Sequence, residues 1–191
     1  MNTYLEFEKP IEQLDNKVHE LKSLNDNAPS DNLLEEITQV EEQINETYRK
    51  IYSSISPWQR TLVARHPQRP KTREYIQNLI EDFFPLSGDR FFSEDKAILG
   101  GFGKFRGKTV LVLGHEKGHD TTSRIEHNFG MPRPEGYRKA QRLMKLAEDF
   151  DIPVISFVDT PGAYPGVGAE QRGQSEAIAK TTECCLSLGV P

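Results

Sequence analysis

The stretch IPVISFVDTPGAYPGVGAEQRGQ, residues 152–174, decides the fold class of this chain. Residues 152–158 form a nearly continuous apolar run, which is typical of a buried strand. Residues 159–174 are rich in glycine and proline and form a loop that enters a helix over residues 175–188, closed by Gly189. A buried strand that is followed by a loop and a helix indicates an α/β protein.

The residues upstream of this stretch predict the neighbouring elements. Residues 97–105 and 108–115 carry β-branched side chains punctuated by glycine, and the short turn between them completes the pattern of a β-hairpin. Pro134 is suited to the first turn of a helix that we expect over residues 135–150. The side chains expected to face the core from this helix are Tyr137, Ala140, Leu143, Met144, Ala147 and Phe150.

Two further segments complete the predicted order of elements. Residues 74–84, of sequence EYIQNLIEDFF, are predicted to be helical. Residues 116–131 are polar, and we expect them to be irregular. The resulting order of helix, hairpin, helix, strand and helix places helices outside a sheet.

The N-terminal part of the chain has a different character. Apolar residues recur at helical spacing in residues 10–24 and again in residues 33–51, and the polar turn formers of residues 25–31 separate them. Two amphipathic helices that are joined in this way form an antiparallel hairpin. We therefore predict a helical hairpin arm over residues 1–56 and a second domain over residues 57–191.

Charge separates the same two parts of the chain. Residues 1–50 hold twelve acidic and five basic side chains, whereas the remainder holds seventeen acidic and nineteen basic ones. The net charge of all 191 residues is −5, so the arm alone accounts for the acidity. This asymmetry indicates two parts with different roles.

The composition argues against several classes of protein. No run of about 18 apolar residues is present, so no membrane-spanning helix is predicted. The sequence MNTYLEFEKP lacks the basic start and apolar core of a secretion signal. The only cysteines, Cys184 and Cys185, are adjacent and suit packing better than a disulfide, so we expect a reducing, cytoplasmic location.

A run of basic residues follows the predicted arm. Residues 60–73, RTLVARHPQRPKTR, contain no acidic side chain. The bases are Arg60, Arg65, Arg69, Lys71 and Arg73. Such a run can contact the phosphate groups of a ligand, an acidic partner or only water, and its spacing matches no nucleic-acid-binding motif.

The segment HEKGH, residues 115–119, has the H-E-x-x-H pattern of zinc proteases. A zinc site of that kind needs both histidines on one face of a long helix. Here the pattern directly follows an expected strand, contains Gly118 and precedes weak helix formers. We interpret it as a polar loop at a strand end, with substrate contact by His115 or His119 as an alternative, and we predict no metal in this chain.

A second tempting pattern is GKFRGKT, residues 103–109, which ends like a phosphate-binding P-loop. The first glycine of that motif would fall on Phe102. The turn at Arg106 and Gly107 also joins two expected strands, whereas a P-loop leads into a helix. We therefore expect no nucleotide at this turn.

The loop after the predicted buried strand has the properties of an oxyanion site. Its residues Pro161, Gly162, Ala163, Pro165, Gly166 and Gly168 carry little side chain to keep a ligand away from the backbone. Backbone N–H groups that are exposed near a helix start can donate hydrogen bonds to an oxygen that becomes anionic during a reaction. By itself, the pattern fits a plain connection between strand and helix equally well.

Three blocks of sequence taken together resemble a single family. They are ARHPQRPKTREYI at residues 64–76, GMPRPEGYRKA at 130–140 and IPVISFVDTPGAYPGVGAEQRGQSEAIA at 152–179. They resemble the alpha subunits of bacterial acetyl-CoA carboxylase carboxyltransferase, and the acidic arm and residues 95–118 are similar as well. The resemblance extends over essentially the whole chain, and DTPGAYPG is its most specific motif.

This resemblance implies a fold, an activity and partners. The fold would be the crotonase-like (ClpP/crotonase) α/β spiral of strand-strand-helix units, incomplete at the C-terminus and preceded by the helical arm. The activity would be transfer of a carboxyl group from carboxybiotin, held by the biotin carboxyl carrier protein, to acetyl-CoA, which gives malonyl-CoA for fatty acid synthesis. The partner would be a beta subunit that carries a zinc ribbon, in an α2β2 heterotetramer.

The resemblance also implies a carboxybiotin pocket in the loop after the predicted strand. The residues expected to line it are Pro161, Gly162, Ala163, Tyr164, Pro165, Gly166 and Gly168. We predict that the backbone N–H groups of Gly162 and Ala163 are oxyanion donors. In the family, the glycine-rich oxyanion pair lies in a second cluster after a strand that would begin at Val190, so the 191 residues alone are expected to be inactive.

Two other hypotheses are compatible with the sequence. One is a different crotonase-fold enzyme that acts on a CoA thioester, either a decarboxylase or a hydratase. The other is a non-catalytic scaffold that docks a protein through the helical arm. Dependence of the reaction on biotin distinguishes the first from a carboxyltransferase, and deletion of residues 1–50 tests the second.

Overall fold

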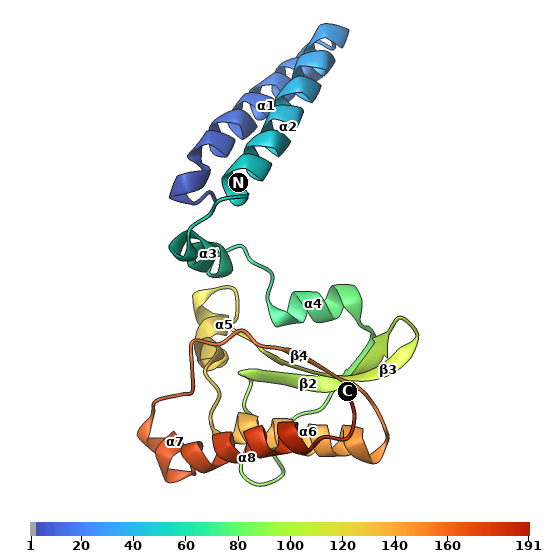
Figure 1. Ribbon diagram of the computed structural model, residues 1–191, viewed down its shortest axis with the longest axis vertical. Coiled ribbons are helices and arrows are strands. Elements are labelled where there is room, and N and C mark those ends of the chain that lie inside the picture. The colour runs from blue at the N-terminus through green and yellow to red at the C-terminus, as the bar shows by residue number, and fades with distance from the viewer. Residues whose placement is uncertain (1–2) are drawn as a thin grey trace. The chain divides into compact units, whose positions relative to one another are not determined.

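The computed structural model describes residues 3–191 and divides the chain into two compact units, Met1–Arg69 and Pro70–Pro191 (Figure 1). Each unit has a hydrophobic core of its own. The division lies beyond residue 56, where the arm is predicted to end. None of the helices in the described residues has the length and apolar character needed to span a membrane.

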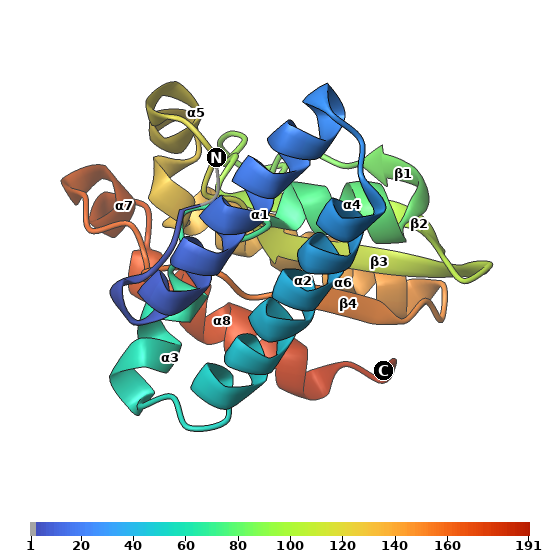
Figure 2. The same ribbon diagram turned by 90° about the horizontal axis from the view of Figure 1, so that it is seen from above.

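The first unit contains the predicted helical hairpin (Figure 2). A 3₁₀ turn, η1 at Glu6–Glu8, leads into α1, Lys9–Asn27, and the chain returns through α2, Asp31–Tyr52. The buried side chains between them are Val18, Leu21, Ile37 and Val40, with Leu14, Leu33 and Ile44 packed beside them. The apolar spacing in the sequence therefore predicts both helices and the faces that they bury.

A further helix, α3 at Pro57–Ala64, follows the hairpin within the same unit. Ser56 begins it, because its hydroxyl oxygen accepts a hydrogen bond of 3.2 Å from the Gln59 N–H, while the Gln59 side chain accepts one of 2.7 Å from the Ser56 N–H. The basic run of residues 60–73 starts in this helix and ends in the second unit, so its bases are shared between the two units.

The second unit is built on a sheet with the strand order β1-β2-β3-β4 within the described residues. The strands are β1 at Glu81–Pro85, β2 at Ile98–Phe105, β3 at Lys108–His115 and β4 at Val154–Phe157. The β1–β2 and β2–β3 pairs are antiparallel, and β3 and β4 are parallel. The carboxyl ends of β3 and β4 therefore lie at the same edge of the sheet.

Helices cover both faces of this sheet (Figure 1). On one face lie α6, Pro134–Asp149, and α8, Gln174–Ser187, and on the other lies α4, Thr72–Leu79. Alternate residues of β3 enter the two cores, since Leu111 and Leu113 pack with α6 and α8, whereas Val110 and Val112 pack with α4. This alternation shows that β3 is covered by helices on both faces, in a three-layer α/β/α arrangement.

The predicted β-hairpin is confirmed, and β2 and β3 pair along their whole length. Arg106 and Gly107 connect them with φ angles of 50° and 76°. Positive φ at both central residues is the signature of a type I′ turn, whose twist matches that of the strands. The turn joins two strands and leads into no helix, so it lacks the context that a P-loop requires.

The helix predicted over residues 74–84 is wrong in its second half. Helix α4 ends at Leu79, and the following residues form β1, which pairs with β2. Gly101 and Gly103 of β2 make room for this strand, because a Cβ at Gly101 would collide with the backbone carbonyl of Phe84. Pairing between segments distant in sequence therefore overrides the local helical pattern.

Strand β4 is less buried than its apolar sequence predicts. Val154, Ile155 and Phe157 are half-buried, Ser156 is exposed, and Val158, just beyond the strand, is 79% exposed. The reason is its place at the edge of the sheet, where β3 is the strand paired with it in the described residues. On its other side, the Val154 N–H donates a hydrogen bond of 2.8 Å to the carbonyl oxygen of Pro191.

Helix α6 agrees with the prediction apart from its last expected core residue. Ala140, Leu143, Met144 and Ala147 are buried, and Tyr137 is half-buried. Phe150 is instead 68% exposed, since the helix ends at Asp149 and its apolar face does not continue past that residue.

Short helices lie in two segments that were expected to be irregular. Helix α5, Thr121–Glu126, begins at Asp120, whose carboxylate accepts a hydrogen bond of 2.9 Å from the Ser123 N–H. It is followed by the 3₁₀ turn η2, Asn128–Gly130, and helix α7, Val167–Gln171, lies within the loop that precedes α8. Local capping explains α5, although the residues that compose it are weak helix formers.

Candidate functional site

The candidate site is the group of loops at the carboxyl ends of β3 and β4. It comprises residues 115–118 at the end of β3, residues 128–131 around η2, and residues 158–166 after β4. In Figure 1 the loop after β4 runs past α5 before it reaches α7. Open α/β sheets bind ligands in this position, outside the carboxyl ends of parallel strands.

Thr160 anchors the first part of the loop after β4. Its hydroxyl donates a hydrogen bond of 2.6 Å to the carbonyl oxygen of Gly130. The same hydroxyl oxygen accepts a hydrogen bond of 3.0 Å from the Gly162 N–H. The threonine therefore attaches the loop to η2 and orders the backbone at Gly162.

Tyr164 anchors the second part of this loop. Its N–H donates to the carbonyl oxygen of Pro132 at 3.0 Å, and its own carbonyl oxygen accepts from the buried side-chain amide of Gln174 at 3.3 Å. The guanidinium of Arg133 lies over its ring, 4.5 Å from the centroid. The start of α6 and the start of α8 thus hold the loop from two sides.

Between these anchors, one backbone donor is left over. The Gly162 N–H is occupied by Thr160 and the Tyr164 N–H by Pro132, whereas the Ala163 N–H has no acceptor within the described residues. In this conformation Gly162 is therefore not free to donate to a ligand, and Ala163 is. Gly162 has a φ of 148°, a backbone angle that favours glycine.

The other residues predicted to line the pocket have different positions. Pro161 and Pro165 are exposed, Gly166 is the N-cap of α7, and Gly168 lies inside that helix. Gly166 also touches the ring of Tyr164 so closely that a Cβ would collide with it. These residues form one continuous loop, and between Thr160 and Tyr164 the Ala163 N–H is the donor without an acceptor in the described residues.

The turn over Asn128–Gly130 has a conformation that sequence reasoning missed. Three consecutive residues have positive φ, 47° at Asn128, 57° at Phe129 and 76° at Gly130. A left-handed conformation costs a non-glycine residue about 1–2 kcal/mol. A Cβ at Gly130 would lie 2.6 Å from Cγ of Lys117, so the turn brings the backbone tightly against that side chain. Backbone strain of this kind is concentrated at functional sites.

The interpretation of HEKGH as a polar loop at a strand end is confirmed. His115 is the last residue of β3, His119 is exposed, and no helix carries both. Glu116 is 1% exposed, and its carboxylate accepts hydrogen bonds from the Gly118 N–H at 2.9 Å and the Arg73 N–H at 3.0 Å. Across residues 3–191, no cluster of three His, Cys, Asp or Glu side chains is placed to hold a metal ion.

Lys117 is the remaining charged residue of that loop, and sequence reasoning did not single it out. Its ammonium group forms an ion pair with the carboxylate of Asp159, which comes directly before Thr160. The pair connects the loop after β3 with the loop after β4. No motif in the sequence signals it, because the two residues are brought together only by the parallel pairing of the strands.

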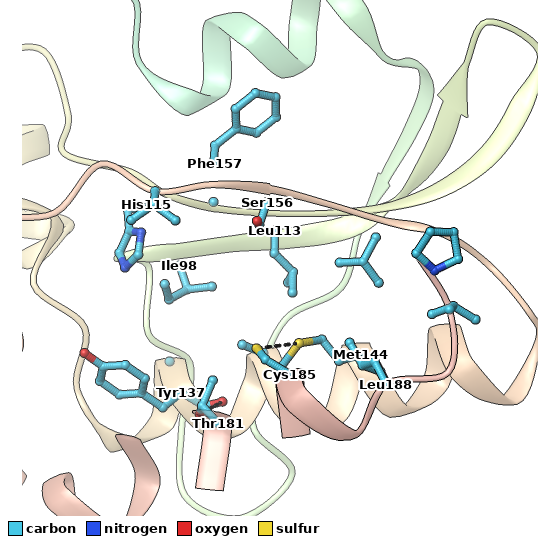
Figure 3. A pocket seen from close by; sticks show the side chains of 17 residues that line it. Ile98, Leu113, His115, Tyr137, Met144, Ser156, Phe157, Thr181, Cys185 and Leu188 are labelled. Atoms are coloured by element: carbon cyan, nitrogen blue, oxygen red, sulfur yellow. Dashed lines mark hydrogen bonds between the residues drawn. The ribbon is translucent and has the colours of Figure 1, made fainter. Parts of the chain in front are cut away.

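His115 lies beside a mainly apolar cavity of about 400 Å³ between the sheet and helices α6 and α8 (Figure 3). Its side chain points into the cavity on the same side as Tyr137. The Nδ1 atom is buried and has no hydrogen-bond partner in the described residues. Burial lowers the pKa of His115 below its usual value of 6.5, so the ring is neutral near pH 7.

A buried ionic network supports the far end of the site. Glu135, 1% exposed, accepts a hydrogen bond of 2.5 Å from Nε of Arg172, which lies between α7 and α8. Arg138 donates to Asp89 at 2.9 Å and to the carbonyl oxygen of Arg172 at 3.1 Å. The PEGYRK sequence at the start of α6 therefore secures the segment that follows the loop.

Solved structures share this fold. A single-chain, multi-domain long-chain acyl-CoA carboxylase matches 68% of this chain and 13% of its own, with a TM-score of 0.54 at 23% identity. A transcarboxylase 12S matches 63% of this chain and 22% of its own, with a TM-score of 0.51 at 21% identity. The fold is thus the crotonase-like α/β fold, as predicted.

Sequence comparison identifies the family of this chain, beyond the fold that the solved structures show. The model of the family described as "Acetyl co-enzyme A carboxylase carboxyltransferase-like" matches residues 4–191, and the chain belongs to this family. Curated relatives named acetyl-coenzyme A carboxylase carboxyl transferase subunit alpha are 56% identical over 191 residues in Rhodopseudomonas palustris (strain HaA2) and 57% identical over 188 residues in Caulobacter vibrioides (strain NA1000 / CB15N). These matches cover 100% and 98% of this chain, and 59% of each relative's length. The resemblance inferred from the sequence is confirmed.

Proposed function

We propose that this chain is part of the alpha subunit of an acetyl-CoA carboxylase carboxyltransferase, which transfers a carboxyl group from carboxybiotin to acetyl-CoA and yields malonyl-CoA. Membership of the family and the shared name of its relatives support this reaction class. The proposed partners are a beta subunit with a zinc ribbon, in an α2β2 heterotetramer, and the biotin carboxyl carrier protein. A cytoplasmic location belongs to the same proposal.

The observation that carries the proposal is the open N–H group of Ala163. Its neighbours Gly162 and Tyr164 have their own N–H groups engaged, so the stretch between Thr160 and Tyr164 is held at both ends and leaves one donor unused. Pro161 and Gly162 precede this donor, and the Ala163 side chain is only a methyl group. The residues that lead up to this amide therefore add no large side chain around it.

Biotin, when bound, would supply the nitrogen that carries the carboxyl group, an oxygen that becomes anionic as that group leaves, and the base for the acetyl methyl proton. The residues of the loop fit such a group, because the Ala163 N–H can donate to the anionic oxygen. A backbone amide neither ionises nor needs to reorient during the reaction. Removal of one such donor typically costs about 2.7–4 kcal/mol of transition-state stabilisation.

The test of this proposal is the biotin dependence of turnover. The full-length subunit that contains this chain, assembled with its carboxyltransferase partner, is assayed for decarboxylation of malonyl-CoA with and without free biotin. We expect turnover only when biotin is present. Biotin-independent decarboxylation would instead identify a crotonase-fold decarboxylase. Full activity with residues 1–50 deleted would show that the arm is not needed for the assembly.

A further inference from the structure

We infer that Lys117 and Asp159 form a positioning pair, which holds the loop after β4 so that the Ala163 N–H points at the reacting group. The catalytic consequence of this inference rests on the proposed carboxyl-transfer function. Its structural part, the control of the loop by the ion pair, stands independently of the reaction and is tested separately below.

The location of the pair distinguishes it from an ordinary surface ion pair. Lys117 and Asp159 follow two adjacent parallel strands, whose last paired residues are Gly114 and Phe157. Their side chains are 30% and 38% exposed, compared with 51% and 74% for the pair of Lys104 with Asp82 in the same unit. Partial shielding from water and salt strengthens the attraction between the charges.

One end of the pair is fixed by its surroundings. Lys117 projects from a loop that the buried carboxylate of Glu116 fastens to the Gly118 N–H and the Arg73 N–H. The aliphatic part of its side chain lies against Gly130, where a Cβ would come within 2.6 Å of Cγ. The side chain of Lys117 therefore has little conformational freedom to pair with a different carboxylate.

The other end leads directly to the open amide. Asp159 precedes Thr160, whose hydroxyl bonds to Gly130 and receives the Gly162 N–H. The position of Asp159 therefore determines where Thr160 lies, and Thr160 in turn orients Gly162 and the Ala163 that follows it. On the far side, Tyr164 stays attached to Pro132, so loss of the ion pair would loosen one end of the loop only, where the hydrogen bond of Thr160 to Gly130 would remain.

A catalytic consequence follows from this one-sided release. A misplacement of about 1 Å in a reacting group can lower turnover about 100-fold. Because neither charged group needs to touch the substrate in this arrangement, the pair acts through Ala163 and not on the substrate itself. We therefore expect its loss to lower kcat and to leave KM for malonyl-CoA nearly unchanged.

The experiment compares four variants of the full-length subunit assembled with its partner. They are Lys117→Met, Asp159→Asn, the double variant, and the matched control Lys104→Met, which removes an ion pair near the amino end of β3. Turnover of malonyl-CoA with free biotin gives kcat and KM. Hydrogen exchange of residues 160–164 reports on the loop without reference to activity.

The expected results are specific to the pair. Each single variant should lower kcat by about 10- to 100-fold with KM within about twofold, and the double variant should be no worse than either single one. Exchange in residues 160–164 should accelerate in all three variants. Lys104→Met should match the unmodified enzyme in both measurements.

Two results would overturn the inference. Unchanged exchange in residues 160–164 would show that the ion pair does not order the loop. Effects of the two single variants that multiply in the double variant would show that the residues act separately. If the unmodified enzyme shows no biotin-dependent turnover, the proposed function fails, and the exchange measurement alone then decides whether the pair positions the loop.

Discussion

The loops that follow β3 and β4 begin side by side and differ in how their backbone groups are used. The loop after β3 contains the last four residues of HEKGH and ends at the N-cap of α5, and its Gly118 N–H donates a hydrogen bond to the buried carboxylate of Glu116. The loop after β4 has anchors at Thr160 and Tyr164 and an unused donor at Ala163 between them. The first loop is suited to support and the second to binding.

The comparison shows why a familiar pattern of letters misleads. HEKGH contains two histidines and a glutamate, yet the glutamate carboxylate accepts a backbone hydrogen bond and the histidines lie on no common helix. DTPGAYPG contains few groups with side-chain chemistry, yet it leaves a backbone donor open. In this molecule the candidate chemistry resides in main-chain atoms, for which small side chains are the only sequence signal.

Removal of the open donor should have the largest effect. Ala163→Pro deletes the N–H, and we expect kcat for biotin-dependent malonyl-CoA turnover to fall about 100- to 1,000-fold, in line with the loss of one oxyanion donor. Ala163→Gly keeps the N–H and is the matched control, with an expected loss of no more than about fivefold from added backbone freedom.

Stability measurements keep this test decisive. Thermal unfolding of both Ala163 variants shows whether a loss of turnover comes from misfolding, and exchange protection of the core strands gives a second check. An Ala163→Pro enzyme that is folded and fully active would eliminate the amide from the mechanism. It would also remove the contrast between the two loops.

Much of the fold follows from the sequence because periodicity and turn chemistry are local. The alternation in residues 108–115, the Arg-Gly turn and the helical spacing in the arm each act over a few residues. Strand β1 could not be predicted in this way, since its conformation depends on glycines of β2 that lie about twenty residues further along the chain. The half-buried state of β4 likewise depends on its neighbours.

The candidate site was predictable in part for the same reason. Small residues around Gly162 indicate an accessible backbone, but they do not reveal which amide Thr160 occupies. The ion pair of Lys117 with Asp159 and the left-handed turn at Phe129 arise from contacts between three separate loops. Such contacts leave no spacing pattern in a single sequence.

An intermediate effect is expected in the supporting loop. Glu116→Gln replaces one acceptor oxygen with an NH₂ group that faces a backbone N–H, so a buried donor loses its partner. We expect the free energy of unfolding to fall by about 1–3 kcal/mol, measured by denaturant unfolding of the full-length subunit. Turnover per folded molecule should change far less than for Ala163→Pro. A fall in kcat as large as that of Ala163→Pro would mean that the two loops do not divide support from binding.

The smallest effect concerns the histidine that ends β3. Burial lowers the pKa of His115 in the folded state below its usual value of 6.5, which the unfolded chain keeps. Below pH 6.5 the unfolded state therefore binds a proton that the folded state does not, and stability falls as the pH decreases. His115→Gln removes this titration, so its melting temperature should depend less on pH between 7.5 and 5.5 than that of the unmodified subunit. If the melting temperatures of the two proteins depend on pH equally, the loss of stability in acid comes from groups other than His115. The His115 ring at the edge of the cavity would then be hydrated and readily protonated.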